Sequence, residues 1–158
     1  MHASLSSDIS IRQAELILKL YELRRETTMR EARSYIGGEF GPSSAVELIA
    51  IVGGGGKHGA FVLQVYGYWD MVAAFVESGA LDARLVYNTC QEMYFQYAKI
   101  QPYLAEFRKI MNLPEWMGGI ELLVEGSEIG RSRLQIMKKN LAALAAARAA
   151  SNPATPAS

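Results

Sequence analysis

The feature that most constrains the fold is a single carboxylate inside the most apolar stretch of the chain. Asp70 interrupts residues 61–76, where nearly every neighbour is of a type that is usually buried. Burying an unpaired charge is costly, so Asp70 needs a cation, several hydrogen bonds, contact with water, or a proton. The arginine-rich segment 23–33 is the expected source of a cation, and we expect Arg24 or Arg25 to pair with Asp70. The fold must then bring these two segments together.

The spacing of apolar residues predicts an all-α fold, because it follows the helical period and no segment alternates with a period of two. We expect a helical bundle of about five to six helices. The first expected helix begins after Ser6, Ser7 or Asp8 and ends near Ile36, and the second is short and capped by Ser44. The third covers 57–78, and the fourth begins at Asp82 and is kinked at Pro102. The fifth and sixth cover 114–125 and 128–150. The third of these is apolar on every face, which predicts the central helix of the bundle. Asn112 and Glu115 have the spacing of a capping box for the fifth.

The length of 158 residues is that of one domain. We expect a single helical domain over residues 1–150 and a disordered, proline-containing polar tail over 151–158. Cys90 is the only cysteine, so an internal disulfide is impossible, and the lack of cysteine clusters argues against structural zinc. The first residues lack the pattern of a secretory signal. We therefore expect a cytoplasmic location.

Charge and hydropathy argue against nucleic-acid and membrane partners. Sixteen basic residues balance sixteen acidic ones, so no overall field attracts an anionic polymer or surface. The apolar region 45–76 is divided by the glycines 53–56 into pieces shorter than the roughly 20 residues that span a bilayer. The basic residues of the last helix leave nucleic-acid binding as the weaker alternative.

Motifs for catalysis or for a cofactor are not evident in the sequence. The glycine-rich segment 53–58 lacks the first glycine and the final Ser or Thr of a phosphate-binding loop, which favours a connector over an anion site. His2 and His58 are far apart and have no acidic cluster beside them. Cys90 lies on an apolar helix face, where a thiol usually acts as a small hydrophobe. We expect no metal and no cofactor, and assign no catalytic residue.

One set of residues remains as a candidate site between the first, third and fourth expected helices. Buried phenol and indole groups need hydrogen-bond partners, and nearby acids and arginines can supply them. The set is Arg24, Arg25, Trp69, Asp70, Glu92 and Tyr94. It is either a structural polar network or a ligand-binding site, with catalysis the third alternative.

The last expected helix carries a narrow apolar stripe. Leu134, Met137, Leu141 and Leu144 repeat at about seven residues, a spacing that suits packing on a partner helix. We expect this face to support a homodimer.

Several short strings resemble an uncharacterised family of bacterial all-helical proteins. They are Leu20-Tyr-Glu-Leu-Arg-Arg-Glu26, Met29-Arg-Glu-Ala-Arg33, Tyr68-Trp-Asp-Met71, Val76-Glu-Ser-Gly-Ala-Leu81, Glu92-Met-Tyr-Phe95, Ala98-Lys-Ile-Gln-Pro102 and Phe107-Arg108. The pattern is also similar to a broader domain of unknown function, some members of which carry membrane helices before the soluble part. The resemblance covers roughly residues 15 to 125. It implies the helical fold and no particular activity, cofactor or functional residue.

The sequence therefore favours a non-enzymatic interaction or scaffold module that forms a homodimer. The alternative is a small-ligand-binding protein or an enzyme that uses the polar cluster.

Overall fold

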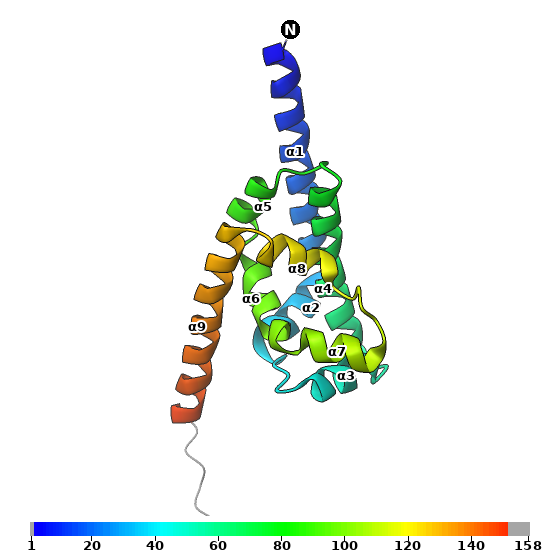
Figure 1. Ribbon diagram of the computed structural model, residues 1–158, viewed down its shortest axis with the longest axis vertical. Helices are drawn as coiled ribbons and strands as arrows, with labels where there is room; N and C mark the ends of the chain where they lie inside the picture. Colours follow the sequence, from blue (N-terminus) through cyan, green and yellow to red (C-terminus); the bar gives the residue numbers. More distant parts are fainter. Residues whose placement is uncertain (1, 152–158) are drawn as a thin grey trace, which may run out of the picture.

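The computed structural model describes the backbone of residues 2–151 and the side chains of residues 8–151. Within that range the regular structure is all helical, with nine α-helices and one short 3-10 helix (Figure 1). They are α1 (His2–Arg25), α2 (Thr27–Gly38), α3 (Ala45–Gly53), α4 (Lys57–Glu77), α5 (Ala83–Thr89), α6 (Gln91–Ile100), η1 (Gln101–Tyr103), α7 (Leu104–Met111), α8 (Gly118–Glu125) and α9 (Glu128–Ser151). The all-α class is confirmed, but the expected five to six helices are wrong, because the first and fourth are each divided. Apart from Ser151, the expected disordered tail lies outside the described residues.

The expected first helix is divided at Glu26 into α1 and α2. Glu26 has an extended ψ of 142°, which ends the helical path. Arg33 Nη1 donates a hydrogen bond of 3.2 Å to the carbonyl oxygen of Arg24, one of the carbonyls that a helix end leaves without an intrahelical partner. The break is thus supported by a contact between residues of the two helices, and it brings Arg24 and Arg33 together.

The expected fourth helix is divided at Cys90, with φ −111° and ψ 56°, between α5 and α6. The carbonyl oxygen of Thr89 accepts a hydrogen bond of 2.6 Å from the hydroxyl of Tyr21 in α1. The hydroxyl of Thr89 donates to the carbonyl oxygen of Leu85 at 2.7 Å. A side chain from another helix therefore satisfies the carbonyl next to the break.

The central apolar helix is confirmed as α4, which packs against α2, α3 and α8. Its buried residues lie on one side of the helix and are Gly59, Phe61, Val62, Val65, Tyr66, Tyr68, Trp69, Val72 and Ala73. Ala60, Leu63, Gly67 and Ala74 are exposed on the other side, so the expectation of a helix buried on every face is wrong. Among the described helices, α4 alone has the length and apolar composition to cross a membrane, and 50% of that stretch is buried inside the fold. Burial of this extent is typical of a core helix.

The predicted capping box at Asn112 and Glu115 is wrong. Asn112 has a left-handed conformation, with φ 53°, and its N–H bonds the carbonyl oxygen of Arg108. It therefore ends α7, in the role that Gly and Asn usually have at a helix C-terminus. The next helix, α8, begins only at Gly118 and has no capping side chain of its own.

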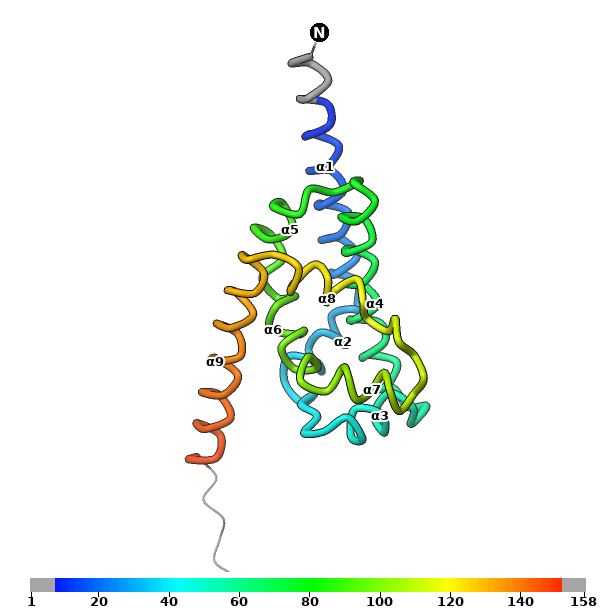
Figure 2. The backbone as a smooth tube through the Cα atoms, in the orientation of Figure 1, coloured from blue at the N-terminus to red at the C-terminus, as the bar shows by residue number. Residues whose placement is uncertain are grey.

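The final helix, α9, runs along α6 and α8. Leu134 is buried, and Met137 and Leu141 are half-buried against the core. The interpretation of this stripe as a free partner face is therefore wrong for three of its four residues, and Leu144 alone is exposed. At the other end of the molecule, the N-terminal part of α1 extends beyond the remaining helices (Figure 2).

Candidate functional site

The predicted polar cluster is built around Glu92, in the first turn of α6. Its Oε2 contacts Arg24 Nη2 from α1 and lies 2.6 Å from Arg33 Nη2 from α2. Arg33 Nε also donates to Glu92 Oε1 at 2.9 Å. One carboxylate thus binds two guanidinium groups and joins the helices on either side of the Glu26 break to α6.

A second chain of hydrogen bonds continues from Glu92 into the core. Gln96, one helical turn further along α6, donates to Glu92 Oε1 at 2.6 Å. The indole N–H of Trp69 donates to Gln96 Oε1 at 2.5 Å. Nearby, the hydroxyl of Tyr68 donates to the carbonyl oxygen of Leu20 at 3.0 Å. The network therefore connects α1, α2, α4 and α6, and Gln96 is satisfied at both ends of its amide.

The two arginines of the cluster are held by the Glu92 carboxylate and by aromatic rings. Arg24 is only 7% exposed, and its guanidinium lies over the rings of Tyr21 and Trp69, at 5.0 and 5.2 Å from their centroids. The hydrogen bond to Glu92 raises the pKa of Arg33. Aromatic faces stabilise a cation that is partly removed from water. Glu92 and the two rings together offset part of the cost of burying Arg24, whose Nε has no hydrogen-bond partner among the described residues.

The contacts of Glu92, Cys90 and His58 bear on the chemistry that these three side chains can support. Glu92 is held by two cations and an amide, so it is a poor general base, because a base must be free to take a proton. Burial raises the pKa of the Cys90 thiol, which works against a thiolate nucleophile. His58 is exposed and stacks on Tyr35 at 4.1 Å, and no group of three metal-ligating side chains occurs among the described residues. The arrangement joins α1, α2 and α6 through Glu92, and we call it the joint.

Asp70 is not part of this joint, and its expected pairing with Arg24 or Arg25 is wrong. Its Oδ1 accepts a hydrogen bond of 3.0 Å from the backbone N–H of Ile120, in the first turn of α8. A Cβ added at Gly119 would lie 2.8 Å from the same oxygen. Asp70 and Trp69 are adjacent on α4, and consecutive helical side chains point about 100° apart, so only Trp69 faces Arg24. Asp70 can therefore interrupt the apolar stretch 61–76 because its carboxylate binds the N-terminus of α8.

Arg25 and Tyr94 also lie apart from Glu92. Arg25 is exposed at the end of α1. Tyr94 is buried on α6, where Arg133 of α9 lies over its ring at 5.6 Å, and burial raises the pKa of its hydroxyl. Of the six predicted residues, the structure thus brings together Arg24, Trp69 and Glu92.

Two members of the network, Arg33 and Gln96, were not among the predicted site residues. A signal for Gln96 exists in the sequence, because it follows Glu92 by four residues and so lies on the same helix face. Arg33 gives no such signal, since its position depends on the break at Glu26.

Comparison with known proteins identifies one similarity. The model of a family described as a domain of unknown function (DUF4760) matches residues 9–127. The matched range ends just before α9 and includes every residue of the Glu92 network. No curated protein and no solved structure matches the chain. The predicted resemblance to an uncharacterised family is confirmed.

Proposed function

We propose that the chain, which belongs to the DUF4760 family, is a non-enzymatic protein-interaction module that assembles as a homodimer. The proposed contact between the two copies is the outer face of α1. There, Ile11, Ala14, Leu18 and Tyr21 form an apolar stripe, which we call the outer stripe. The proposal includes a cytoplasmic location and no metal, nucleic-acid or membrane partner.

The observation that carries the proposal is the exposure of the outer stripe. Ile11 is 54% and Leu18 63% exposed, and Ala14 and Tyr21 are exposed as well. The four residues are separated by three, four and three positions, which places them on one helix face in the pattern of a helix that pairs with another. Single exposed apolar side chains are ordinary, whereas a contiguous run supports an interaction surface.

The inner face of α1 is already occupied within the chain. Ile17, Leu20 and Arg24 are buried against the other helices. The helix therefore has two apolar faces. The fold uses the inner face and, at one end of the outer stripe, Tyr21, which contacts Thr89 and Arg24. The N-terminal part of α1 extends beyond the remaining helices (Figure 1), and all four residues of the outer stripe are exposed.

Charge supports a second copy of this chain as that partner. Arg12, Glu15, Lys19 and Glu22 follow one border of the outer stripe and alternate in sign. A surface with alternating charge is self-complementary when two copies pair antiparallel, about a two-fold axis perpendicular to the helices, because each cation then faces an anion of the partner. A partner that carried one sign of charge would meet repulsion at every second position.

The polar cluster supports a non-enzymatic role. Glu92 makes its short contacts with Arg24, Arg33 and Gln96, which leaves no free acid or base at the joint. The two described cavities are lined by other residues than these.

The mass in solution tests the proposal. We expect sedimentation equilibrium of the full chain to give about twice the monomer mass of 17.4 kDa. Leu18→Glu puts a charge in the middle of the outer stripe, and we expect that variant to be monomeric with an unchanged helical circular dichroism spectrum.

Leu122→Glu is the matched control, because Leu122 is 62% exposed on α8, away from the outer stripe. It is expected to remain dimeric. A monomeric wild type, or a Leu18→Glu variant that stays dimeric, would contradict the proposal.

A further inference from the structure

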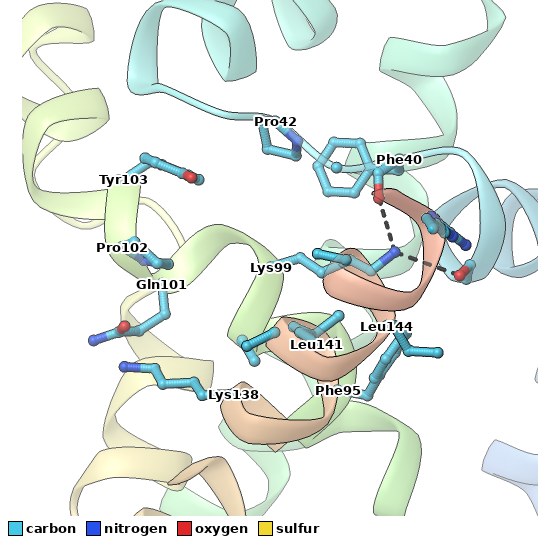
Figure 3. Close-up of a pocket in the computed structure, with 16 residues that line it drawn as sticks. Phe40, Pro42, Phe95, Lys99, Gln101, Pro102, Tyr103, Lys138, Leu141 and Leu144 are labelled. Atoms are coloured by element: carbon cyan, nitrogen blue, oxygen red, sulfur yellow. Dashed lines mark hydrogen bonds between the residues drawn. The ribbon is translucent and has the colours of Figure 1, made fainter. Parts of the chain in front are cut away.

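A groove of about 780 Å³ lies between α9 and the part of the chain formed by α6, η1 and the loop after α2 (Figure 3). This volume is within the range of roughly 300–1,000 Å³ that small-molecule sites occupy. The groove contains no residue of the outer stripe or of the Glu92 network, so a ligand bound there is independent of the proposed dimer.

The walls of the groove are mainly apolar. Phe40 and Pro42 come from the loop after α2, Phe95 from α6, and Leu141 and Leu144 from α9. Leu144 is 47% exposed, whereas Leu134, Met137 and Leu141, the other residues of the apolar stripe on α9, are buried or half-buried. Such walls suit an aliphatic chain, which gains free energy when it leaves water.

The charged groups of the groove all carry one sign of charge. Lys99, Lys138 and Arg148 line it, and none of its 16 lining residues is acidic. Lys99 is half-buried, and its Nζ donates to the carbonyl oxygens of Ile36 at 2.5 Å and Phe40 at 2.7 Å. A third carbonyl contact, to Gly37, is long at 3.4 Å. The ammonium group therefore has hydrogen-bond acceptors beside it but no described counter-ion.

Burial is the main cause that lowers the pKa of Lys99 to about 8, and the positive charge of Arg148 lowers it further. Both causes oppose the charged form of Lys99. An anion placed between these two residues would remove the repulsion and replace part of the lost hydration. The groove thus has positively charged side chains without an acidic partner in its lining, together with an apolar surface.

We propose that this groove binds a single-chain aliphatic carboxylate, free in solution, with its head group at Lys99 and Arg148 and its chain along Leu141, Leu144 and Phe95. Figure 3 shows Lys99 and these apolar side chains at the same hollow, with Lys138 at its edge. The small volume and the concave shape favour one monomeric amphiphile over a membrane surface, which is flat on this scale.

Calorimetric titration of the full chain with dodecanoate, kept below its micelle concentration at pH 7, tests the proposal. We expect saturable binding of one molecule per chain. Dodecyltrimethylammonium has the same chain and the opposite charge, and we expect it to bind at least about tenfold more weakly. Equal affinity for the two amphiphiles would overturn the proposal, as would binding that does not saturate.

Matched variants of α9 locate the site. Lys138→Gln combined with Arg148→Gln is expected to weaken dodecanoate binding about tenfold, since two cations of the groove are lost. Lys139→Gln removes the neighbouring cation, which does not line the groove, and should leave the affinity within twofold. Leu144→Glu should weaken binding by a similar factor to the double variant, whereas Ile136→Glu, at an exposed α9 position outside the groove, should not. An unchanged affinity in the double variant and in Leu144→Glu would overturn the assignment.

A vesicle experiment separates the free ligand from a lipid surface. We expect the chain to stay in the supernatant when it is sedimented with phosphatidylcholine vesicles that contain phosphatidylglycerol. Sedimentation with the vesicles, together with no binding of monomeric dodecanoate, would overturn the proposal in favour of a membrane-surface role.

Discussion

The carboxylate of Asp70 in α4 accepts a hydrogen bond from the backbone N–H of Ile120, 3.0 Å away in the first turn of α8. The residue before α8, Met117, has a left-handed φ of 56° and offers no capping side chain. Asp70 therefore accepts a hydrogen bond from a free N–H group at the start of α8, as an N-cap residue does. It differs from an ordinary N-cap in belonging to another helix, α4. Its negative charge also faces the positive end of the α8 dipole.

Asp70→Ala should lower the free energy of unfolding by about 1 kcal/mol, the usual value of a helix N-cap. Asp70→Asn keeps an oxygen acceptor and should cost less than half of that. Urea unfolding of the two variants measures both values. A loss of about 3 kcal/mol in Asp70→Ala would instead indicate that a buried cation has lost its partner.

Gly119→Ala should also destabilise the protein, because the new Cβ would lie 2.8 Å from Asp70 Oδ1 and 3.3 Å from the Cβ of Ala73. We expect a loss of about 1–3 kcal/mol in urea unfolding, the usual cost of overpacking. In the Asp70→Ala background the loss should be smaller, since two of the three closest atoms, Oδ1 and Cγ of Asp70, are gone. Gly118→Ala is the matched control, because its Cβ would meet only Glu115 Oε2 at 3.9 Å. Equal losses at Gly118 and Gly119 would exclude the close approach as the cause.

Glu92→Gln keeps the shape of the side chain and removes the charge that Arg24 and Arg33 share. Arg24 would remain buried without a counter-ion, so we expect unfolding to become easier by about 2–3 kcal/mol. Chemical denaturation at neutral pH measures the change. Glu77→Gln removes an exposed carboxylate of α4, away from the joint and from the outer stripe, and should lie within about 0.5 kcal/mol of the wild type. If Glu92→Gln were as mild as this control, the joint would contribute nothing to stability.

The helical segments were largely predictable from local rules. Ser44 caps α3 by accepting a hydrogen bond from the N–H of Glu47 at 3.1 Å, and Gly79 has the left-handed φ of 76° expected after α4. The divisions at Glu26 and Cys90 were not predictable, because neither position holds a Gly or Pro. They depend on Arg33 and Tyr21, which reach carbonyl oxygens across the fold.

The types of residue in the polar site were predictable from the sequence, but which acid pairs with which arginine was not. A buried arginine and a carboxylate partner were expected, and the structure has both, as Arg24 and Glu92. Which carboxylate faces Arg24 depends on the rotation of α4 about its axis, and that rotation follows from the packing of three neighbouring helices. Local spacing carries no information about it, so Asp70 was assigned to the wrong neighbour.

The titration of Lys99 gives a prediction with a defined sign. Its pKa is about 8 in the folded protein and near its ordinary value of 10.5 when unfolded. Between these values the unfolded chain binds more protons, so stability should rise with pH, by at most about 1.4 kcal/mol per pH unit. Burial raises the pKa of Cys90 and has the opposite effect, and therefore the useful quantity is the difference between the wild type and Lys99→Met. We expect urea unfolding between pH 7.5 and pH 9.5 to show a more positive slope in the wild type than in Lys99→Met. Parallel slopes would mean that Lys99 keeps its ordinary pKa in the folded protein.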